Sequence, residues 1–211
     1  MKKETVVISL GGSLVVPDEI DVKFLQGFRK ILTKFPDYKF IIAPGGGKTA
    51  RKYGAALKSL GDRDIAGSDW LGIYSIRLNR LLLSFVFKRT KNVDVMQSPN
   101  AKPGQTSDSH AVEYAKSHGA KMIINLSNID YVYDKNPAQH KNAKPLKNIV
   151  WKDFRKIIGS KWQANQSWPF DPTASKTAEK FKLKVVFMNG KPLANLKNYL
   201  SGKNFKGTVI K

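Results

Sequence analysis

Two glycine-rich segments stand where predicted strands end, and both have the composition of an anion-binding loop. The first is "GGSL" at Gly11–Leu14, and the second is "GGGKTAR" at Gly45–Arg51. Glycine lets backbone N–H groups approach a ligand closely, and a following helix start adds partial positive charge, so each segment could hold phosphate oxygens. A tight strand-to-helix turn explains either segment alone. Two such segments together favour a phosphate site.

The second segment resembles the end of an ATP-binding P-loop, but its spacing excludes that motif. The P-loop pattern G-x-x-x-x-G-K-[ST] needs a glycine five residues before Gly47, and that position is Ile42. The ligand of this segment must therefore be inferred in another way.

A third polar segment, "KPGQTSDSHAVEYA" from Lys102 to Ala115, turns at Pro103-Gly104 into a predicted helix. The hydroxyl groups of Thr106 and Ser107 could donate to a phosphate or a base. An acid beside phosphates, here Asp108, needs another task, such as holding a lysine or magnesium in place. Ordinary helix capping explains Ser107 and Asp108 equally well.

A fourth segment, "INLSNIDYVYDKNP" from Ile124 to Pro137, passes from an apolar strand into polar and aromatic residues. These residues are Ser127, Asn128, Asp130, Tyr133 and Asp134. A polar cluster with an aromatic ring at a strand exit could hold the base and ribose of a nucleotide. The same pattern is also typical of an ordinary surface loop.

The four segments follow strand-like runs that alternate with helical patterns along the chain. The expected strands are Thr5–Ser9, Lys39–Ala43, Val93–Met96, Lys121–Leu126, Lys184–Met188 and Gly207–Ile210. This alternation predicts an α/β fold, in which a mostly parallel central sheet is covered by helices. Ligand sites in such sheets lie beyond the carboxyl ends of the strands, where the polar segments are expected.

Helices are expected between most of these strands, and turn-rich segments elsewhere. The expected helices are Asp21–Lys34, Lys48–Ser59, Gly67–Lys88, Ser107–His118, Lys152–Ile158, Asp171–Lys182 and Pro192–Leu200. Asp21, Ser107 and Asp171 are the expected N-terminal caps. Tyr133–Lys147 is predicted as an exposed loop and Gln97–Gln105 as a turn-rich connection.

Length and composition indicate one globular domain. The chain has 211 residues, of which 41% are hydrophobic, enough to bury a core. It has no cysteine, which suits a reducing compartment, and no apolar run approaches the length of a membrane span. The N-terminus runs from two lysines into a strand without a cleavage site, so a cytoplasmic protein is expected.

The formal net charge of +21 would ordinarily raise nucleic acid as a partner. Only seven of the 37 basic residues are arginines, and the lysines are scattered without a basic block or interleaved aromatic residues. A solvated lysine-rich surface is therefore expected, and a nucleic-acid partner is not.

Two other groups of residues have side chains that can do chemistry. His110, His118 and His140 lack metal-ligand spacing, so no metal site is expected. The tryptophans before "FDPTASK", which are Trp151, Trp162 and Trp168, are expected to pack locally and not to form a stacking platform.

The polar segments, in this order, resemble the amino acid kinase family, and more narrowly its UMP kinases of the archaeal type. The resemblance covers nearly the whole chain and implies a three-layer αβα sandwich. The motifs that carry it are "GGSL", "GGGKTARKY", "DWLGIYSIRLN" (Asp69–Asn79), "PGQTSD", "LSNIDYVYDKNP", "FDPTASK" (Phe170–Lys176) and the ending "NG…L…G…GTVI".

The resemblance implies a division into an acceptor-binding lobe, about residues 1–100, and an ATP-binding lobe, about residues 101–211. ATP would be bound by Gly11, Gly12, Ser13, Gly47, Arg51, Ser127, Tyr133 and Asn136. UMP would be bound by Gly45, Gly46, Asp69, Ala101, Lys102, Pro103, Gly104, Gln105, Thr106 and Ser107. Asp69 would accept from the ribose hydroxyls, and residues 101–107 would form the uridine-side loop.

The resemblance also implies the reaction, in which ATP and UMP give ADP and UDP with Mg²⁺, in pyrimidine nucleotide biosynthesis. Asp108 would organise the catalytic centre, and Lys176 would neutralise charge on the transferred phosphoryl group, with Lys48 as a further cation. Such a reaction needs positioning and positive charge more than a protein nucleophile. Homo-oligomers are common in the family, so one is expected here.

Several positions depart from the family pattern. Ser9 stands where many members have a lysine, Tyr131 where glycine is usual, and Asn136 where aspartate is usual. The uridine-side loop lacks a typical Gly-Gly pair, and the connection after Lys88 is shorter than usual. These departures keep open a kinase of another small acidic acceptor, and a catalytically weak nucleotide-binding or storage protein.

Overall fold

The computed structural model describes residues 3–61, 64–97, 101–159 and 168–211, and its centre is a seven-stranded sheet. The strands lie in the order β3 (Val93–Val95), β2 (Tyr38–Pro44), β1 (Glu4–Leu10), β4 (Met122–Ser127), β8 (Lys184–Asn189), β9 (Thr208–Ile210) and β7 (Asn148–Ile149). Neighbouring strands are parallel except for β8 and β9, which pair antiparallel. The predicted mostly parallel α/β sheet is confirmed.

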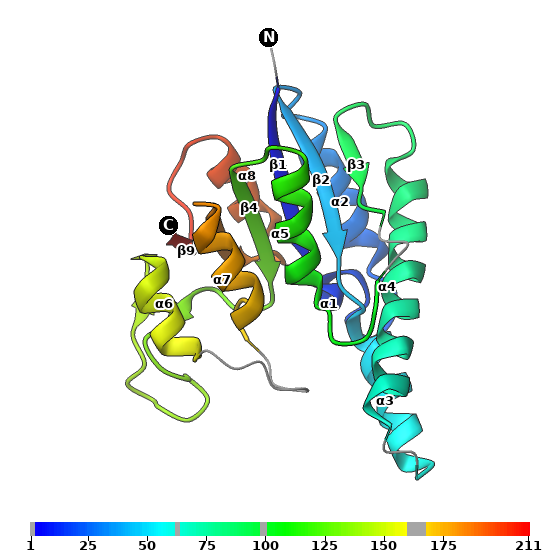
Figure 1. The fold of residues 1–211 in the computed structure, drawn as a ribbon. Coiled ribbons are helices and arrows are strands. Elements are labelled where there is room, and N and C mark those ends of the chain that lie inside the picture. The colour runs from blue at the N-terminus through cyan, green and yellow to red at the C-terminus, as the bar shows by residue number, and fades with distance from the viewer. Residues whose placement is uncertain (1–2, 62–63, 98–100, 160–167) are drawn as a thin grey trace.

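Helices cover both faces of this sheet and complete three layers (Figure 1). One face is covered by α1 (Gly12–Val15), α2 (Val22–Leu32), the C-terminal part of α4 (Ile65–Phe87) and α8 (Leu193–Leu200). The other face is covered by α5 (Ser107–Ser117), α6 (Trp151–Ile158) and α7 (Pro172–Lys180). Helix α3 (Gly47–Ser59) packs against α4, and the two extend together beyond the sheet (Figure 1).

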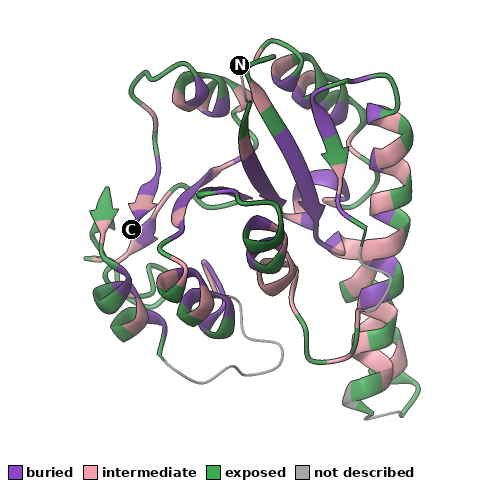
Figure 2. Cartoon of the chain, turned by 45° about the horizontal axis from the view of Figure 1, so that its top comes forward, coloured by how far each residue is buried: buried purple, intermediate pink, exposed green. Residues whose placement is uncertain are grey.

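The strand residues alternate between these two layers, as the two-residue period of a strand requires. Val6, Ile8 and Leu10 of β1 belong to the core beneath α2 and α8, whereas Val7 packs beneath α5 and α7. Ser9 therefore points to the layer of α5 and α7. The central strands are buried on both faces, as Figure 2 shows in purple, so they are apolar nearly throughout.

The predicted loop at Tyr133–Lys147 was wrong at both ends. Val132–Tyr133 forms β5 and pairs antiparallel with β6 at Pro145–Leu146. Strands of two residues are too short to produce a periodic pattern, so local patterns could not predict them. A further contact anchors β5 to the main sheet, because the Val132 N–H donates to Thr208 Oγ1 at 2.9 Å.

The helix starts were predicted in part. Asp21 and Asp171 cap α2 and α7, because each carboxylate accepts from a backbone N–H three residues later. Thr106, and not Ser107, caps α5, and its hydroxyl accepts from the Ser109 N–H. Asp64 caps α4, which leaves Asp69 free of that task.

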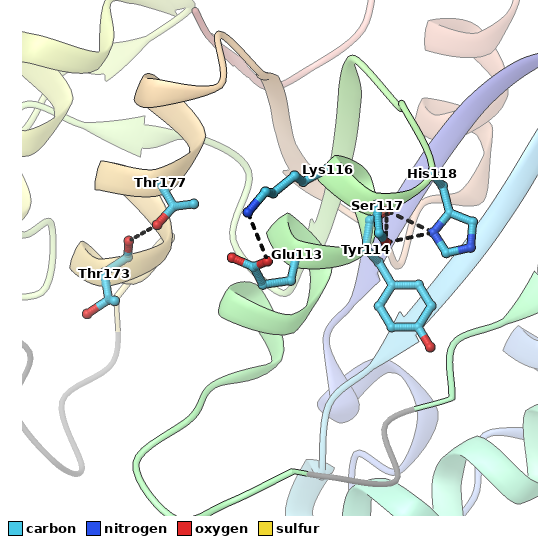
Figure 3. Close-up of polar contacts among 7 residues, drawn as sticks. All are labelled: Glu113, Tyr114, Lys116, Ser117, His118, Thr173 and Thr177. Carbon is cyan, nitrogen blue, oxygen red and sulfur yellow. Dashed lines mark hydrogen bonds and ion pairs between the residues drawn. The ribbon is translucent and has the colours of Figure 1, made fainter.

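Polar residues on the outer faces of α5 and α7 make local contacts (Figure 3). At the C-terminal end of α5, the ring of His118 stacks on that of Tyr114, with centroids 5.2 Å apart. Lys116 pairs with Glu113 at 3.8 Å, and Thr177 Oγ1 donates to the Thr173 carbonyl at 3.2 Å. These contacts lie on the helices themselves, and α5 directs its other end towards the glycine loops.

Two of the tryptophans are packed as expected. Trp151 is buried and donates from Nε1 to the Leu183 carbonyl at 3.0 Å, and Trp168 packs against the core beneath α5 and α7. Trp162 lies outside the described residues. In the described part of the chain, no helix is long and apolar enough to cross a membrane.

Candidate nucleotide and phosphoryl-transfer site

The two glycine loops touch one another at the carboxyl ends of β1 and β2. A Cβ atom added to Gly12 would lie 2.0 Å from the Gly47 nitrogen and 2.5 Å from the Gly45 carbonyl carbon. Gly47 has φ +69°, a left-handed conformation that favours glycine. Only glycine at position 12 allows this approach, and it brings the starts of α1 and α3 to one place.

The N–H groups of the two loops are unequally available to a ligand. The Gly11 N–H donates to the Leu126 carbonyl at 2.8 Å, and the Gly45 N–H donates to the Leu10 carbonyl at 2.9 Å. Both bonds continue the hydrogen-bonding ladder of the sheet. The Lys48 N–H, in the first turn of α3, is also engaged, because it donates to the Val16 carbonyl at 3.0 Å. Since the first N–H groups of a helix have no partner within it, the Gly12 and Gly47 N–H groups are the candidate donors for an anion.

Next to the loops, Ser9 meets the start of α5. Ser9 is buried, and its hydroxyl donates to Asp108 Oδ1 at 3.0 Å. The other Asp108 oxygen accepts from the Asp171 N–H at 3.3 Å, which ties the starts of α5 and α7 together. Asn125 Nδ2 lies 3.5 Å from Asp108 Oδ1 and donates to the Pro169 carbonyl at 3.3 Å.

Asp171 is the second carboxylate of this cluster. One of its oxygens accepts from the hydroxyls of Thr106 and Ser109, and the other accepts from the Ala174 N–H. Both Asp171 and Asp108 therefore accept hydrogen bonds from neutral donors only. Burial, and secondarily the charge of Asp171, raises the pKa of Asp108 to about 7, although the Ser9 hydroxyl opposes this shift.

The loop of residues 101–107, which was predicted to be the uridine-side loop, contacts α4 through Asp69. The Gly104 N–H donates to Asp69 Oδ2 at 2.8 Å, across 35 residues of sequence. This bond places the loop of residues 101–105 beside the first half of α4. The same helix also holds the second glycine loop, because Asn79 Nδ2 donates to the Gly45 carbonyl at 2.8 Å.

The three predicted cations lie apart from the buried cluster. Lys48 forms an ion pair with Asp18 at 3.1 Å, and Asp18 also pairs with Lys52 at 2.8 Å. Arg51 and Lys176 are exposed, on α3 and α7 respectively. No basic side chain forms an ion pair with Asp108 among the described residues.

Sequence comparison gives the family. The pattern of the amino acid kinase family matches residues 92–189. A uridylate kinase from Thermoplasma volcanium is 34% identical, over 95% of this chain and 94% of its own. The chain belongs to the amino acid kinase family. A uridylate kinase from Methanococcus aeolicus is 30% identical, over 97% of this chain and 98% of its own.

Solved structures of similar shape agree with this membership of the amino acid kinase family. The crystal structure of a uridylate kinase from Archaeoglobus fulgidus superposes with a TM-score of 0.79 at 28% identity, and each chain is covered completely. A UMP kinase from Bacillus anthracis superposes with a TM-score of 0.81 at 19% identity, which shows the shared fold alone. The predicted amino acid kinase fold is confirmed.

For an amino acid kinase, the nucleotide loop after β4 is unusual at two positions, and the structure accommodates both. Tyr131, which stands where glycine is usual, does not adopt positive φ, and its ring packs edge-on to that of Tyr133, with centroids 6.4 Å apart. Asn136 is exposed, and its Oδ1 accepts from the Ala138 N–H at 3.0 Å. Ser127 lies beside Gly11, since an added Gly11 Cβ would be 3.7 Å from the Ser127 Cα.

Two residues of the site had no predicted role there, and a third was predicted only as the cap of α7. Asn79 holds the second glycine loop, Asn125 lies against the Asp108 carboxylate, and the Asp171 N–H donates to that same carboxylate. Asn79 and Asp171 lie within segments that resemble family motifs, and Asn125 lies in the fourth polar segment. Their roles depend on contacts over 17 to 63 residues of sequence, which no local pattern reveals.

We predict that Gly12→Ala lowers the melting temperature, because its methyl group would meet the backbone of the second glycine loop. Gly72→Ala is the matched control, since a Cβ at this helical glycine of α4 meets nothing within 4 Å. The control should gain about 0.5–1 kcal/mol from helix propensity. Equal melting temperatures for the wild type and Gly12→Ala would contradict the close contact.

We also predict a pH-dependent effect of Asp108→Asn. The pKa of Asp108 rises from 3.8 to about 7 in the folded state, so the folded protein binds a proton between these values and loses stability as the pH rises through them. The melting temperature of Asp108→Asn, relative to the wild type, should increase from about pH 5 to about pH 8.

Asp153→Asn is the control for this measurement. Asp153 is exposed, and its hydrogen bond to Lys156 lowers its pKa, so its replacement should give no such increase. A pH-independent difference between Asp108→Asn and the wild type would show that Asp108 is ionised throughout.

Proposed function

We propose that this protein is a UMP kinase, which transfers the γ-phosphoryl group of ATP to UMP and releases ADP and UDP. The observation that carries the proposal is the direct contact between the glycine loops at Gly12 and at Gly45–Gly47. Two phosphate-binding loops in contact can hold a donor and an acceptor phosphate next to each other. The similarity to uridylate kinases over nearly the whole chain supports UMP as the acceptor.

In this proposal, ATP and UMP bind over different halves of the sheet. ATP would lie over β1, β4 and the nucleotide loop, with its phosphates at Gly11–Ser13 and Gly47 and its nucleoside near Ser127, Tyr133 and Asn136. UMP would lie over β2 and α4, with its phosphate at Gly45–Gly47, its ribose at Asp69 and its base at residues 101–107. This division corresponds to an acceptor-binding lobe of about residues 1–100 and an ATP-binding lobe of about residues 101–211.

In this reaction the protein positions two anions and stabilises charge on the group that passes between them. The N–H groups at the starts of α1 and α3 would bind phosphate oxygens without deprotonating any side chain. Lys176 and Lys48 would supply positive charge once the nucleotides are bound, and Arg51 would contact ATP. Asp108 would hold the starts of α5 and α7 in register with Ser9 of β1.

Magnesium enters this scheme with its nucleotide, as the MgATP substrate. No group of three His, Cys, Asp or Glu side chains within the described ranges could hold a metal ion by itself. That is compatible with Mg²⁺, which often keeps several waters and binds through substrate phosphates with one or two carboxylates.

A second candidate function is a nucleotide-binding protein with little turnover. The observation that favours it is the hydrogen bond between Ser9 and Asp108, since Ser9 occupies a position where a lysine would bring positive charge to the phosphates. Binding of both nucleotides without ADP release would support this candidate.

A coupled assay of ADP release, run with a panel of nucleoside monophosphates and acidic metabolites, tests the proposal. We expect UMP to be the preferred acceptor. Turnover of a different acceptor only, or binding of ATP and UMP without turnover, would reject UMP kinase activity.

Within the same assay, Asp69→Asn tests the acceptor site. An asparagine oxygen can still accept from the Gly104 N–H, but its amide cannot replace the second carboxylate oxygen as a ribose acceptor. The KM for UMP should rise about ten-fold or more while that for ATP changes little. Asp64→Asn, which changes the capping carboxylate at the start of the same helix, should leave the UMP parameters nearly unchanged.

We also propose that the protein forms a homo-oligomer through α4. Large apolar side chains, spaced three or four residues apart, form an exposed stripe along this helix (Trp70, Tyr74, Leu78, Leu81 and Phe85). Such spacing places them on one face of a helix, and a second copy of α4 would present the same face. The five side chains are 41% to 66% exposed, so the rest of the described chain leaves the stripe largely uncovered.

Leu78→Asp tests the oligomer, because it puts a charge in the middle of this stripe. Size-exclusion chromatography with light scattering should give a multiple of the chain mass for the wild type and a smaller assembly for the variant. Val22→Asp, at an equally exposed apolar position on α2, should behave as the wild type. A monomeric wild type would contradict the proposal.

A further inference from the structure

The uridine-side loop contains a tight turn that fixes one side-chain amide. The Gln105 N–H donates to the Lys102 carbonyl at 3.3 Å, and Pro103 and Gly104 occupy the two central positions. Gly104 has φ +83°, as the third residue of a type II turn requires. The Gln105 side chain then folds back, and its Oε1 accepts from the Lys102 N–H at 2.9 Å.

This second bond determines which way the Gln105 amide faces. A backbone N–H can only donate, so the atom that meets it must be the carbonyl oxygen of the side chain. The Nε2 group can only donate, and the turn that carries it is exposed. The loop therefore presents a hydrogen-bond donor whose polarity the turn itself fixes.

The other side chains of residues 101–107 cannot supply such fixed recognition. Ala101, Pro103 and Gly104 have no polar side-chain atom, and Lys102 ends in a flexible ammonium group. The Thr106 hydroxyl is engaged by Asp171 and by the Ser109 N–H. The Ser107 hydroxyl can donate or accept, so it does not distinguish a carbonyl from an amino group.

The turn also lies beside the residue proposed to bind the ribose. Gly104, next to Gln105, donates its N–H to Asp69 Oδ2 at 2.8 Å. A nucleoside whose ribose reaches Asp69 therefore has its base near the same turn. This step rests on the proposed function, in which Asp69 binds the ribose of the acceptor.

We propose that Gln105 is a specificity-determining residue that reads the exocyclic group at C4 of the acceptor pyrimidine. Uracil has a carbonyl oxygen there, which accepts from the Nε2 donor of Gln105. Cytosine has an amino group there, so two hydrogen-bond donors, this amino group and Gln105 Nε2, would face each other and neither would have an acceptor. The site therefore selects uracil over cytosine, and UMP over CMP.

Gln105→Glu reverses this polarity with little change of shape. One carboxylate oxygen can still accept from the Lys102 N–H and keep the turn, while the other presents an acceptor. We expect the ratio of kcat/KM for UMP to that for CMP to fall about ten-fold or more, with kcat/KM for CMP rising. Gln105→Ala should lower kcat/KM for UMP and have less effect on CMP.

Two controls keep the outcome interpretable. Ser107→Ala should change UMP and CMP by similar factors, because a hydroxyl does not discriminate between them. The KM for ATP and the melting temperature should be similar in the wild type and Gln105→Glu.

An active wild type whose UMP to CMP ratio is unchanged in Gln105→Glu and Gln105→Ala would overturn the role of Gln105 and leave the kinase intact. A wild type that phosphorylates neither UMP nor CMP would overturn the proposed function and this inference together.

Discussion

Gly12 lies so close to the backbone of Gly45 and Gly47 that no side chain fits between them. The contact requires β1 and β2 to be adjacent and in register, and Leu10 is paired with Pro44 at their ends. It also requires each strand to turn at once into a helix. The parallel sheet thus places the starts of α1 and α3 next to each other, and the other residues of the site lie around them.

The hydrogen bonds around Ser9 connect the end of β1 to the helices on the other face of the sheet. Because Ser9 points to the layer of α5 and α7, its hydroxyl reaches Asp108, and Asp108 in turn accepts from the backbone at the start of α7. A lysine at position 9 would neutralise this carboxyl group. With serine there, burial and the nearby Asp171 raise the pKa of Asp108, and position 9 supplies no positive charge to bound phosphates.

The sequence was sufficient to predict the elements that depend on local patterns. The main strands, most helices and the glycine loops follow from apolar runs, caps and turn residues, and the resemblance of ordered motifs predicted the family. Contacts between distant segments could not be predicted from local patterns. Examples are the hydrogen bond from Gly104 to Asp69, the hydrogen bond from Asn79 to the Gly45 carbonyl, and the ion pair of Lys48 with Asp18. Strands of two residues, such as β5, also left no signal, because they form only where the sheet supplies a partner.

The central claim is that the two glycine loops bind a donor and an acceptor phosphate in one continuous site. A bisubstrate nucleotide, in which adenosine and uridine are joined through a polyphosphate chain, tests it by calorimetric titration. The account predicts one molecule bound per chain, about 100-fold or more tighter than ATP or UMP alone, because one ligand makes the contacts of both. Affinity no greater than that of ATP, or two molecules bound per chain, would contradict it.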